Sequence, residues 1–475
     1  MPPKKSMKKS SAKPAFRAAS RMSKPAVSVP ATANAAEVAP PPRKGMGPIQ
    51  SVRGMRDLLP SDQHYWRRVN ALSDRIATSY GFDRIDTPLV EETALFIRGV
   101  GRSTDIVEKE LYSWETPGGE NVSLRPEGTA SVVRAYVQHG MLNQPQPVKL
   151  WYLGPMFRYD RPQAGRFRQF YQLGFEAIGD EDPVIDAQLM IVGWNFLRSL
   201  GIDAVVRVNS LGSPDSRANY KNALVAYFRS KRAKLSDDDK RRLLKNPLRL
   251  LDSKDPAVQE MKAEAPQIVD WLDEHSKSHF MRVLEYLDEV GVPYQLDPYL
   301  VRGLDYYTKT VFEWYAAGDE QALAQTALGG GGRYDGLVEQ LGGRPDTPAA
   351  GFSFGLDRVV SRIKDTQPST SIGYKADVFL AQLGDMGKKK AIALFEEFRE
   401  AGIPVGEAFS KSNIKAQMEI ANRQGSKWVV VIGQKEVLDG TAIIRDMEAG
   451  SQEIVDGKKV VHEIKKKLGR ITNGE

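Results

Sequence analysis

The chain has 475 residues, 41% hydrophobic and 27% charged, which is enough for two to four domains with ordinary globular cores. It contains no cysteine, which excludes disulfides, thiolate zinc sites and cysteine nucleophiles. Of the five histidines, only His275 and His279 have the i,i+4 spacing of a helical metal pair, and we expect them on a surface helix without a metal. No run approaches the roughly 18 apolar residues that cross a bilayer, so we expect a soluble protein without a membrane partner.

The net charge of +7 comes from the N-terminal end of the chain. Residues 1–50 contain ten Lys or Arg and one acid, Glu37, whereas the other 425 residues contain 57 basic and 59 acidic side chains. Residues 1–48 are rich in Lys, Ala, Ser and Pro and cannot bury a core, so they are predicted to be a disordered basic tail. Two interpretations stay open for it: a solvated arm that attracts RNA weakly, and an organellar transit peptide.

Regular structure is expected from about residue 49. "HYWRRVNALSDRIATSY" spaces Val69, Leu72 and Ile76 at helical intervals, which predicts a helix that Gly81 ends. "FDRIDTPLV" is typical of a strand, and Pro88 suits a strand at an edge or an interface. "NVSLRPEGTASVVRAYVQHG" predicts a strand, then a turn, then a helix with Thr129 as its N-cap.

A hairpin with four arginines follows, in "WYLGPMFRYDRPQAGRFRQFYQLGFEAI". Strand alternation assigns Phe167, Tyr171, Leu173 and Phe175 to an apolar face that belongs to the core. The opposite face carries Arg158, Phe170, Gln172 and Glu176, and we expect it to line a cleft. Arginine forks bind phosphate oxygens, an aromatic ring can stack on a purine, and Glu and Gln can hold an ammonium group. Arg168 has the same parity as the cleft residues, but no ligand is assigned to it.

The second half of the chain alternates in character. Residues 215–290 are mostly charged helix and are interpreted as a helical insertion in a mainly β domain. Strands return at "YLVRGLDYYTKTVFEWYA" and "GFSFGLDR", with "ALGGGGRYDGL" between them. The four glycines lack the Gly-Lys-Ser/Thr ending of a P-loop, and we expect them to let the backbone approach a ligand closely. After a linker at 364–376, strands and helices alternate in a small α/β domain of about 100 residues.

Together these stretches resemble the histidyl-tRNA synthetases, a family of class II aminoacyl-tRNA synthetases, over about residues 50–475. "GFDRIDTPLV", "GPMFRYDRPQAGRFRQFYQLGFE" and "GFSFGLDR" resemble class II motifs 1, 2 and 3. "LVRGLDYYTKTVFEW" and "ALGGGGRYDGL" resemble the two histidine-specific motifs, and the form of motif 2 is similar to that of bacterial or organellar members.

The resemblance implies an α/β (α+β) fold class and three regions. Residues 1–48 are the tail, and residues 49–365 form a catalytic domain on an antiparallel sheet flanked by helices, with the insertion at about 215–290. Residues 375–475 form an α/β anticodon-binding domain. The implied activity is ATP-dependent ligation of L-histidine to tRNA(His) through histidyl-adenylate, by a cytoplasmic homodimer that uses ATP with Mg²⁺ and no zinc or other protein-bound metal. A mitochondrial or plastid location through the tail is the alternative.

The resemblance also implies residue roles. Arg158 and Arg302 are the catalytic pair, which neutralise the α-phosphate and the histidine carboxylate. The ATP-binding set is Arg158, Arg166, Phe170 and Arg358, with Phe170 and Arg358 around the adenine. The histidine-binding set is Glu127, Gly128, Thr129, Arg158, Gln172, Glu176, Arg302, Tyr306, Tyr307 and Tyr334, in which Glu176 and Tyr307 recognise the imidazole. Arg161, Gln163 and Arg166 are candidates for contact with the tRNA acceptor end, and Lys411, Lys415 and Arg423 for contact elsewhere on the RNA.

One rival function is the non-aminoacylating regulatory subunit of ATP phosphoribosyltransferase in histidine biosynthesis, which resembles these synthetases. Such subunits lack the C-terminal domain and parts of the active-site motifs. Here the motif residues Glu127, Arg158, Arg302 and Arg358 are present, and so is the C-terminal segment. The sequence therefore favours the ligase.

Overall fold

The structure is a computed structural model that describes residues 48–101, 104–161, 165–253, 255–317, 327–367 and 376–469. The predicted tail, apart from Pro48, and Gln163 of the hairpin loop lie outside the described residues. The parts before and after the linker are described separately below.

The first part is built on an eight-stranded sheet with the strand order β1-β5-β6-β11-β10-β9-β7-β8. The six central strands pair antiparallel, which confirms the predicted fold class, and only the outer pairs β1/β5 and β7/β8 are parallel. The strands are β1 (Asp83–Arg84), β5 (Val148–Phe157), β6 (Gln169–Ile178), β7 (Ala204–Ser210), β8 (Tyr294–Leu296), β9 (Thr308–Ala316), β10 (Gly329–Arg333) and β11 (Ala349–Gly355).

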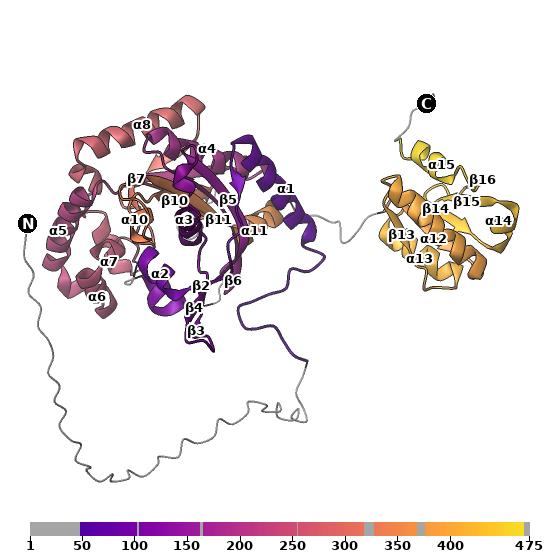
Figure 1. The fold of residues 1–475 in the computed structure, drawn as a ribbon, viewed down its shortest axis with the longest axis horizontal. Coiled ribbons are helices and arrows are strands. Elements are labelled where there is room, and N and C mark those ends of the chain that lie inside the picture. Colours follow the sequence, from indigo (N-terminus) through magenta and orange to yellow (C-terminus); the bar gives the residue numbers. More distant parts are fainter. Residues whose placement is uncertain are drawn as a thin grey trace, which may run out of the picture. The chain divides into compact units, whose positions relative to one another are not determined.

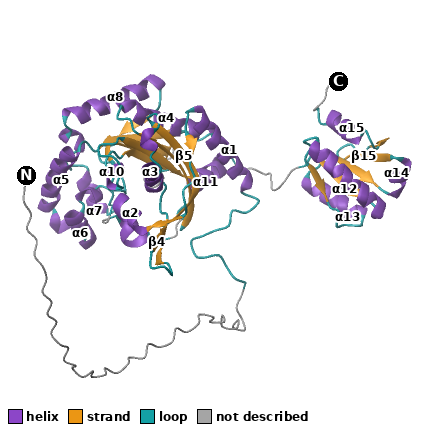
Figure 2. Ribbon diagram, in the orientation of Figure 1, coloured by secondary structure: helices purple, strands orange, loops and turns teal. Residues whose placement is uncertain are grey.

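Helices cover both faces of this sheet (Figures 1 and 2). One face buries Leu173 and Phe175 against α1, α4, α8 and α11, as the strand alternation predicts. On the other face, Tyr136 of α3 and Tyr220 of α5 belong to a second core. One face of β6 therefore packs into the first core, and its other face is available for functional side chains. The helices outside the insertion are α1 (Gln63–Ser79), α2 (Thr93–Gly99), η1 (Ile106–Glu110), α3 (Thr129–Gln138), η2 (Met141–Asn143), α4 (Pro183–Ser199), α10 (Leu337–Gln340) and α11 (Leu356–Thr366).

The strand predicted around Pro88 is not continuous. The chain pairs with β5 only at β1 and then leaves the large sheet, because a proline has no N–H to donate to a ladder. It joins a separate three-stranded sheet with the order β2-β4-β3. Those strands are β2 (Val90–Glu92), β3 (Ser113–Glu115) and β4 (Asn121–Leu124).

The predicted helical insertion between β7 and β8 is confirmed. One expectation within it was wrong: His279 is not on the surface but buried, with its Nε2 3.5 Å from Oδ2 of Asp186. It adjoins the apolar stripe of Phe280, Val283 and Leu287, so it lies on the helix face that packs inward. The insertion comprises α5 (Pro214–Ser230), η3 (Arg232–Lys234), α6 (Asp237–Lys245), η4 (Pro247–Leu250), α7 (Pro256–Lys262), η5 (Ile268–Trp271) and α8 (Glu274–Val290).

The C-terminal part has its own core around a five-stranded sheet with the order β13-β12-β14-β15-β16. The predicted α/β alternation is confirmed, but three short elements, β13, α14 and β16, lack a pattern long enough to predict. The elements are β12 (Val378–Gln382), α12 (Gly384–Glu400), β13 (Val405–Glu407), α13 (Ile414–Gln424), β14 (Trp428–Ile432), α14 (Gln434–Asp439), β15 (Thr441–Asp446), β16 (Gln452–Asp456) and α15 (Val460–Lys467).

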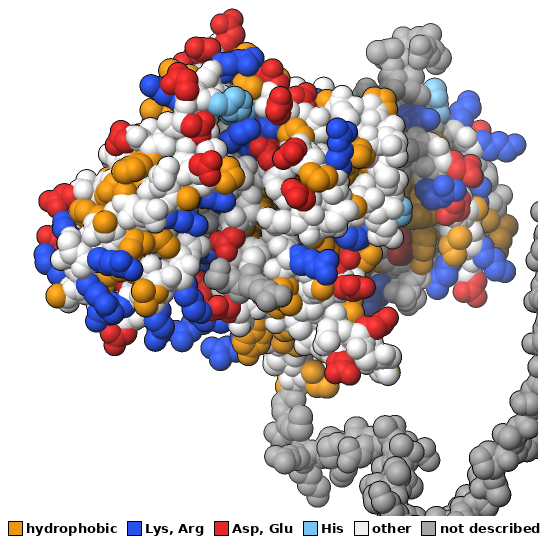
Figure 3. Space-filling model, turned by 60° about the vertical axis from the view of Figure 1, so that its left-hand side comes forward, with side chains coloured by type: hydrophobic (Ala, Val, Ile, Leu, Met, Phe, Trp, Pro, Cys, Tyr) orange, Lys and Arg blue, Asp and Glu red, His pale blue; other side chains and the backbone are white. Residues whose placement is uncertain are grey.

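Figure 3 shows basic and acidic side chains interspersed on the face that it draws. This mixture agrees with the near-neutral charge of the chain beyond residue 50. Among the described residues, no helix is long and apolar enough to cross a membrane.

Candidate active site

A cavity of about 450 Å³ opens where strands of the large sheet meet the segment around η1, the described ends of the hairpin loop and the segment 302–307. It brings together residues from motif-like segments that lie up to 231 positions apart in the chain, from Glu127 to Arg358. Ten of the predicted ligand-binding residues line it directly: Glu127, Thr129, Arg158, Arg166, Phe170, Gln172, Arg302, Tyr306, Tyr307 and Arg358.

The turn before α3 is held by Glu127. Its carboxylate accepts hydrogen bonds from the backbone N–H of Thr129, at 2.7 Å, and of Ala130, at 2.9 Å. The prediction that Thr129 caps this helix is therefore wrong: Gly128 is the N-cap, and the carboxylate of Glu127 satisfies the first free N–H groups. The hydroxyl of Thr129 is free to donate elsewhere, and it donates to Oε1 of Glu176 at 2.8 Å.

Glu176 does not line the cavity itself but lies behind Thr129, which does. It is fully buried, and its Oε2 accepts a 2.5 Å hydrogen bond from the hydroxyl of Tyr334. Burial raises the pKa of Glu176 to about 8. A β-carbon at Gly351 on the neighbouring strand would overlap this carboxylate, so only glycine fits there. The site thus contains a buried carboxyl group surrounded by hydroxyls.

Two arginines enter the cavity from different elements. Arg158 follows β5 and donates from Nε to the carbonyl oxygen of Pro126 at 2.9 Å. Arg302 precedes β9 and forms an ion pair with Glu313, and its guanidinium carbon lies 5.5 Å from the ring centre of Tyr307. Burial lowers the pKa of Arg158, a sign that its charge is incompletely compensated by the protein alone.

Arg166 and Arg358 lie on the more open side of the cavity. Arg166 is exposed and 3.4 Å from Asp160, whereas Arg358 donates from Nη1 to the carbonyl oxygen of Ala327 at 2.8 Å. Burial, together with the charges of Arg166 and Arg158, lowers the pKa of Arg358. This side of the cavity is therefore electropositive and suited to several anionic oxygens.

The remaining arginines of the hairpin are not in the cavity. Arg161 is exposed beside residues outside the described part, and the structure does not test its role or that of Gln163. Arg168 donates to the backbone carbonyls of Asp160 and Arg53, each at 3.2 Å, and stacks on Tyr159. It is a structural residue that holds the start of the loop. Phe167, expected in the core, is half-buried and lines the cavity with Arg56 over its ring.

Gly329 and Gly330 of the glycine run in β10 line the cavity, so the close approach of this backbone to a ligand stays a prediction. The glycines also have a packing role. A β-carbon at Gly330 would lie 2.6 Å from Nη1 of Arg302, and one at Gly332 would lie 2.5 Å from the carbonyl oxygen of Thr310. The missing side chains let neighbouring strands and the guanidinium of Arg302 pack against the strand.

The sequence analysis missed five acidic residues that line the cavity: Asp105, Glu110, Asp160, Glu313 and Asp357. The last two make the clearest contacts within the site. Glu313 of β9 pairs with Arg302, and Asp357 accepts from the backbone N–H of Tyr171 at 2.8 Å and from Arg56 at 2.7 Å. The available signals were a single charge in the otherwise apolar "TVFEWYA" and an acid beside the motif arginine in "GLDR". Either pattern is also common in ordinary strands and helix starts.

In the C-terminal part, Lys411, Lys415 and Arg423 are all exposed. Lys415 and Arg423 belong to α13, and Lys411 precedes it. Their exposure is compatible with binding RNA and equally with plain solvation.

Comparisons with known proteins agree with this geometry. The histidyl-tRNA synthetase family matches residues 54–359, and an anticodon-binding domain matches residues 377–467. The histidine–tRNA ligases of three strains of Dehalococcoides mccartyi are 44% identical over 420 residues, covering 88% of this chain and the whole of each relative.

Solved structures give the same assignment. Apo histidyl-tRNA synthetase of S. aureus superposes with a TM-score of 0.73 at 36% identity, over 88% of this chain and all of that one. The structure titled as an ATP phosphoribosyltransferase regulatory subunit/histidyl-tRNA synthetase from Bacillus halodurans has a TM-score of 0.58 at 22% identity, covering 83% of this chain and 99% of that one, which supports the shared fold alone. The ligase is thus favoured over the regulatory subunit, and this chain belongs to the histidyl-tRNA synthetase family.

Proposed function

We propose that the cavity activates L-histidine with ATP and transfers it to tRNA(His), releasing AMP and diphosphate. One observation supports this most directly: Arg158 and Arg302 enter one cavity from two elements, and the buried carboxyl group of Glu176 lies just behind its wall. An anionic reaction centre beside a pocket for a ring with N–H groups is what histidine adenylation needs.

ATP occupies the electropositive side of the cavity. Arg158 binds the α-phosphate, Arg166 and Arg358 bind the β- and γ-phosphates, and Phe170 stacks on the adenine opposite Arg358. Mg²⁺ enters as part of the Mg–ATP substrate. Such an ion needs one or two protein carboxylates beside the phosphate oxygens, and Asp105, Glu110 and Glu313 line the cavity.

Histidine occupies the closed end. Glu127, Thr129 and Gln172 bind its α-amino group, with Gly128 giving the turn its close approach. Glu176 and Tyr307 bind the imidazole, and Tyr306 and Tyr334 complete the pocket. A pocket built to hydrogen-bond this ring rejects apolar isosteres strongly, because its buried polar groups would be left without partners.

In the first step, a carboxylate oxygen of histidine attacks the α-phosphorus, the bond from that phosphorus to the bridging oxygen breaks, and diphosphate leaves. The developing charge falls on phosphoryl oxygens between Arg158 and Arg302, so the two guanidinium groups stabilise it without proton transfer. In the second step, a ribose hydroxyl at the 3′ end of the tRNA attacks the histidyl carbonyl carbon. The bond from that carbon to the phosphate oxygen breaks, AMP leaves with the electron pair, and the proton of the hydroxyl passes to the leaving phosphate or to solvent.

The tRNA spans two regions of the chain. Residues 49–365 form the catalytic domain, with Arg161, Gln163 and Arg166 as candidate contacts to the acceptor end. Residues 375–475 bind the anticodon region, with Lys411, Lys415 and Arg423 as candidate contacts. The enzyme works in the cytoplasm, and residues 1–48 are a separate tail unless they direct import into a mitochondrion or plastid.

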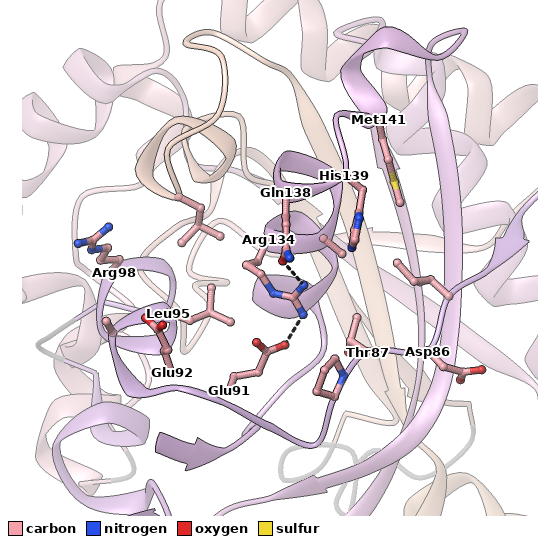
Figure 4. Close-up of a pocket in the computed structure, with 15 residues that line it drawn as sticks. Asp86, Thr87, Glu91, Glu92, Leu95, Arg98, Arg134, Gln138, His139 and Met141 are labelled. Atoms are coloured by element: carbon pink, nitrogen blue, oxygen red, sulfur yellow. Dashed lines mark hydrogen bonds and ion pairs between the residues drawn. The ribbon is translucent and has the colours of Figure 1, made fainter. Parts of the chain in front are cut away.

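The active form is a homodimer, and a second cavity of about 760 Å³ supports this part of the proposal. It is lined by Ile85, Thr87 and Pro88 of the motif 1-like segment and by residues of α2 and α3. Arg134 crosses it, donating to Glu91 at 2.5 Å and to Gln138 at 3.0 Å (Figure 4). Leu89 and Val90 beside it are each 42% exposed, which is unusual for branched apolar side chains and suits contact with a second copy. Light scattering at micromolar concentration should give the dimer mass, and a fully active monomer would contradict this.

The deciding experiment is ATP–pyrophosphate exchange with each of the twenty amino acids in turn. Activity with histidine alone is expected. Exchange with another amino acid, or none with histidine, would overturn the proposed function.

A further inference from the structure

Tyr152 is a buried tyrosine of β5 to which no role has been assigned so far. Tyr152 is only 3% exposed, and its hydroxyl lies close to Thr129 and Glu176 but makes no hydrogen bond of normal geometry in the described part of the chain. Burial raises the pKa of Tyr152 well above its ordinary value, so the hydroxyl keeps its proton and remains a donor. An unpaired hydroxyl is costly in a core, where phenylalanine would fill almost the same space.

The ring of Tyr152 is held between two glycines. Tyr152 pairs with Gly174 in the β5–β6 register, and a β-carbon at Gly174 would overlap the ring. A β-carbon at Gly128 would lie 2.7 Å from the hydroxyl oxygen. The ring therefore lies across Gly174 toward the turn at Gly128, and any side chain at either glycine would displace it.

The hydroxyl of Tyr152 reaches the group of residues around Glu176. Glu176 follows Gly174 by two positions, so it lies on the same face of β6. Thr129 at the start of α3 donates to one oxygen of Glu176, and Tyr334 after β10 donates to the other. Burial raises the pKa of Glu176, and the nearby hydroxyls of Tyr334, Thr129 and Tyr152 act in the opposite direction.

A carboxylate offers about four acceptor positions. Two on Glu176 are used by Thr129 and Tyr334, which leaves positions for a ligand and for one more donor of the protein. Tyr152 is the nearby buried hydroxyl that is still without a partner.

We propose that Tyr152 is a positioning residue for Glu176. When histidine enters the pocket and Glu176 is ionised, the hydroxyl donates to the carboxylate as its third hydroxyl donor and turns the free acceptor position toward the imidazole N–H. The absence of a side chain at both Gly128 and Gly174 leaves the space that the ring of Tyr152 occupies. This inference rests on the proposed contact between Glu176 and the imidazole.

The test uses the full chain with Tyr152→Phe, which removes only the oxygen atom. In histidine-dependent pyrophosphate exchange, the KM for histidine should rise about tenfold, the scale of one hydrogen bond to a charged group, while kcat and the KM for ATP change little. In thiazolylalanine, sulfur replaces the ring N–H of histidine. The ratio of kcat/KM for histidine to kcat/KM for thiazolylalanine should fall by a similar factor. A loss that is only structural would lower the kcat/KM of both substrates equally and leave the preference intact.

Two further variants make the result decisive. Tyr220→Phe is the matched control, because Tyr220 is equally buried and donates to the carbonyl oxygen of Pro266 at 3.0 Å in the insertion; it should leave the KM for histidine unchanged. Glu176→Gln tests the underlying contact. If Glu176→Gln raises the KM for histidine and Tyr152→Phe does not, Tyr152 has no positioning role. If Glu176→Gln itself has no effect, the imidazole contact fails and the inference falls with it.

Discussion

Arg302 and Glu313 form an ion pair inside the candidate active site, eleven residues apart, with both side chains lining the cavity. The hydroxyl of Tyr315 donates to the other oxygen of Glu313 at 2.5 Å, so the carboxylate is held from two directions. Because Gly330 leaves room for the guanidinium, Arg302 has one defined place in the cavity. This arrangement pre-orients a positive charge before any substrate arrives.

The first prediction concerns the charge itself. Arg302→Ala should lower the rate of histidine-dependent pyrophosphate exchange by about 10²–10³-fold, because the charge is needed most in the transition state. The KM for ATP should change much less, since Arg158, Arg166 and Arg358 remain. Arg399→Ala, a change of an exposed arginine on α12, is the control. Exchange at the normal rate in the Arg302 variant would refute the catalytic role.

The second prediction concerns the partner of Arg302. Glu313→Ala should lower kcat about tenfold or more, because the guanidinium loses its fixed position although its charge remains. Glu313→Gln keeps an acceptor for Arg302 and should retain more activity than the alanine variant. Steady-state exchange kinetics on both variants would measure this order, and equal activity of the wild type and Glu313→Ala would show that Glu313 is dispensable.

The sequence predicted those parts of the molecule whose patterns are long or whose motifs are specific. The period-2 alternation of "RFRQFYQLGFE" correctly separated Leu173 and Phe175 from Gln172 and Glu176. The helix at Gln63–Ser79 was predicted from its 3.6-residue periodicity, and the insertion from its charge-rich, helix-forming composition. These signals are local, so a single stretch of sequence contains them.

What could not be predicted depends on contacts between distant segments. Asp357 meets Arg56 across 301 positions, and Glu313 meets Arg302 only because β9 turns back beside the loop before it. Thr129 was assigned as an N-cap because its residue type favours that position, but the carboxylate of Glu127 competes for the same N–H groups and wins. Parity alone assigned Arg168 to the cleft, whereas its contacts to Asp160 and Arg53 draw it away.

The third prediction concerns residues 1–48, whose structure is outside the described part apart from Pro48. The candidate active site is built entirely from residues 105–358. Deleting residues 1–48 should therefore leave the rates of both pyrophosphate exchange and tRNA charging within about twofold of those of the full chain. A twofold change in rate corresponds to well under about 1 kcal/mol in activation free energy. A large loss in either assay would assign the tail a part in the reaction.

The fourth prediction separates the two domains. Residues 378–464 form cores of their own, and the described residues that line the cavity lie between Asp105 and Arg358. Deleting residues 375–475 should spare histidine-dependent pyrophosphate exchange but lower tRNA charging by at least about tenfold, the loss expected when one of two contact regions on the RNA is removed. Unaltered charging would argue against an anticodon-binding role. A loss of exchange would mean that the C-terminal part supports the catalytic domain.

The fifth prediction uses the buried carboxyl group of Glu176. Burial raises the pKa of this group to about 8. In the unfolded chain a glutamate titrates near about 4.3. Between these values the folded protein holds a proton that the unfolded chain has lost, so the free energy of unfolding falls as pH rises from about 4.3 to about 8. This contribution is fully present below about pH 4.3 and is lost as pH rises through the pKa of the folded state.

The side chain of glutamine is neutral at every pH, so the Glu176→Gln variant does not lose free energy of unfolding in this way as the pH rises. The melting temperatures are compared in the absence of substrates. The difference between Glu176→Gln and the wild type should shift in favour of the variant as the pH rises from 5 to 8, by an amount equivalent to a few kcal/mol at most. Glu285→Gln, on the exposed side of α8, is the matched control and should follow the wild type. Thermal unfolding at pH 5, 6.5 and 8 measures the difference. A gap between wild type and Glu176→Gln that is constant with pH would mean that Glu176 is already ionised in the folded protein, and the imidazole would then meet a full carboxylate throughout this range.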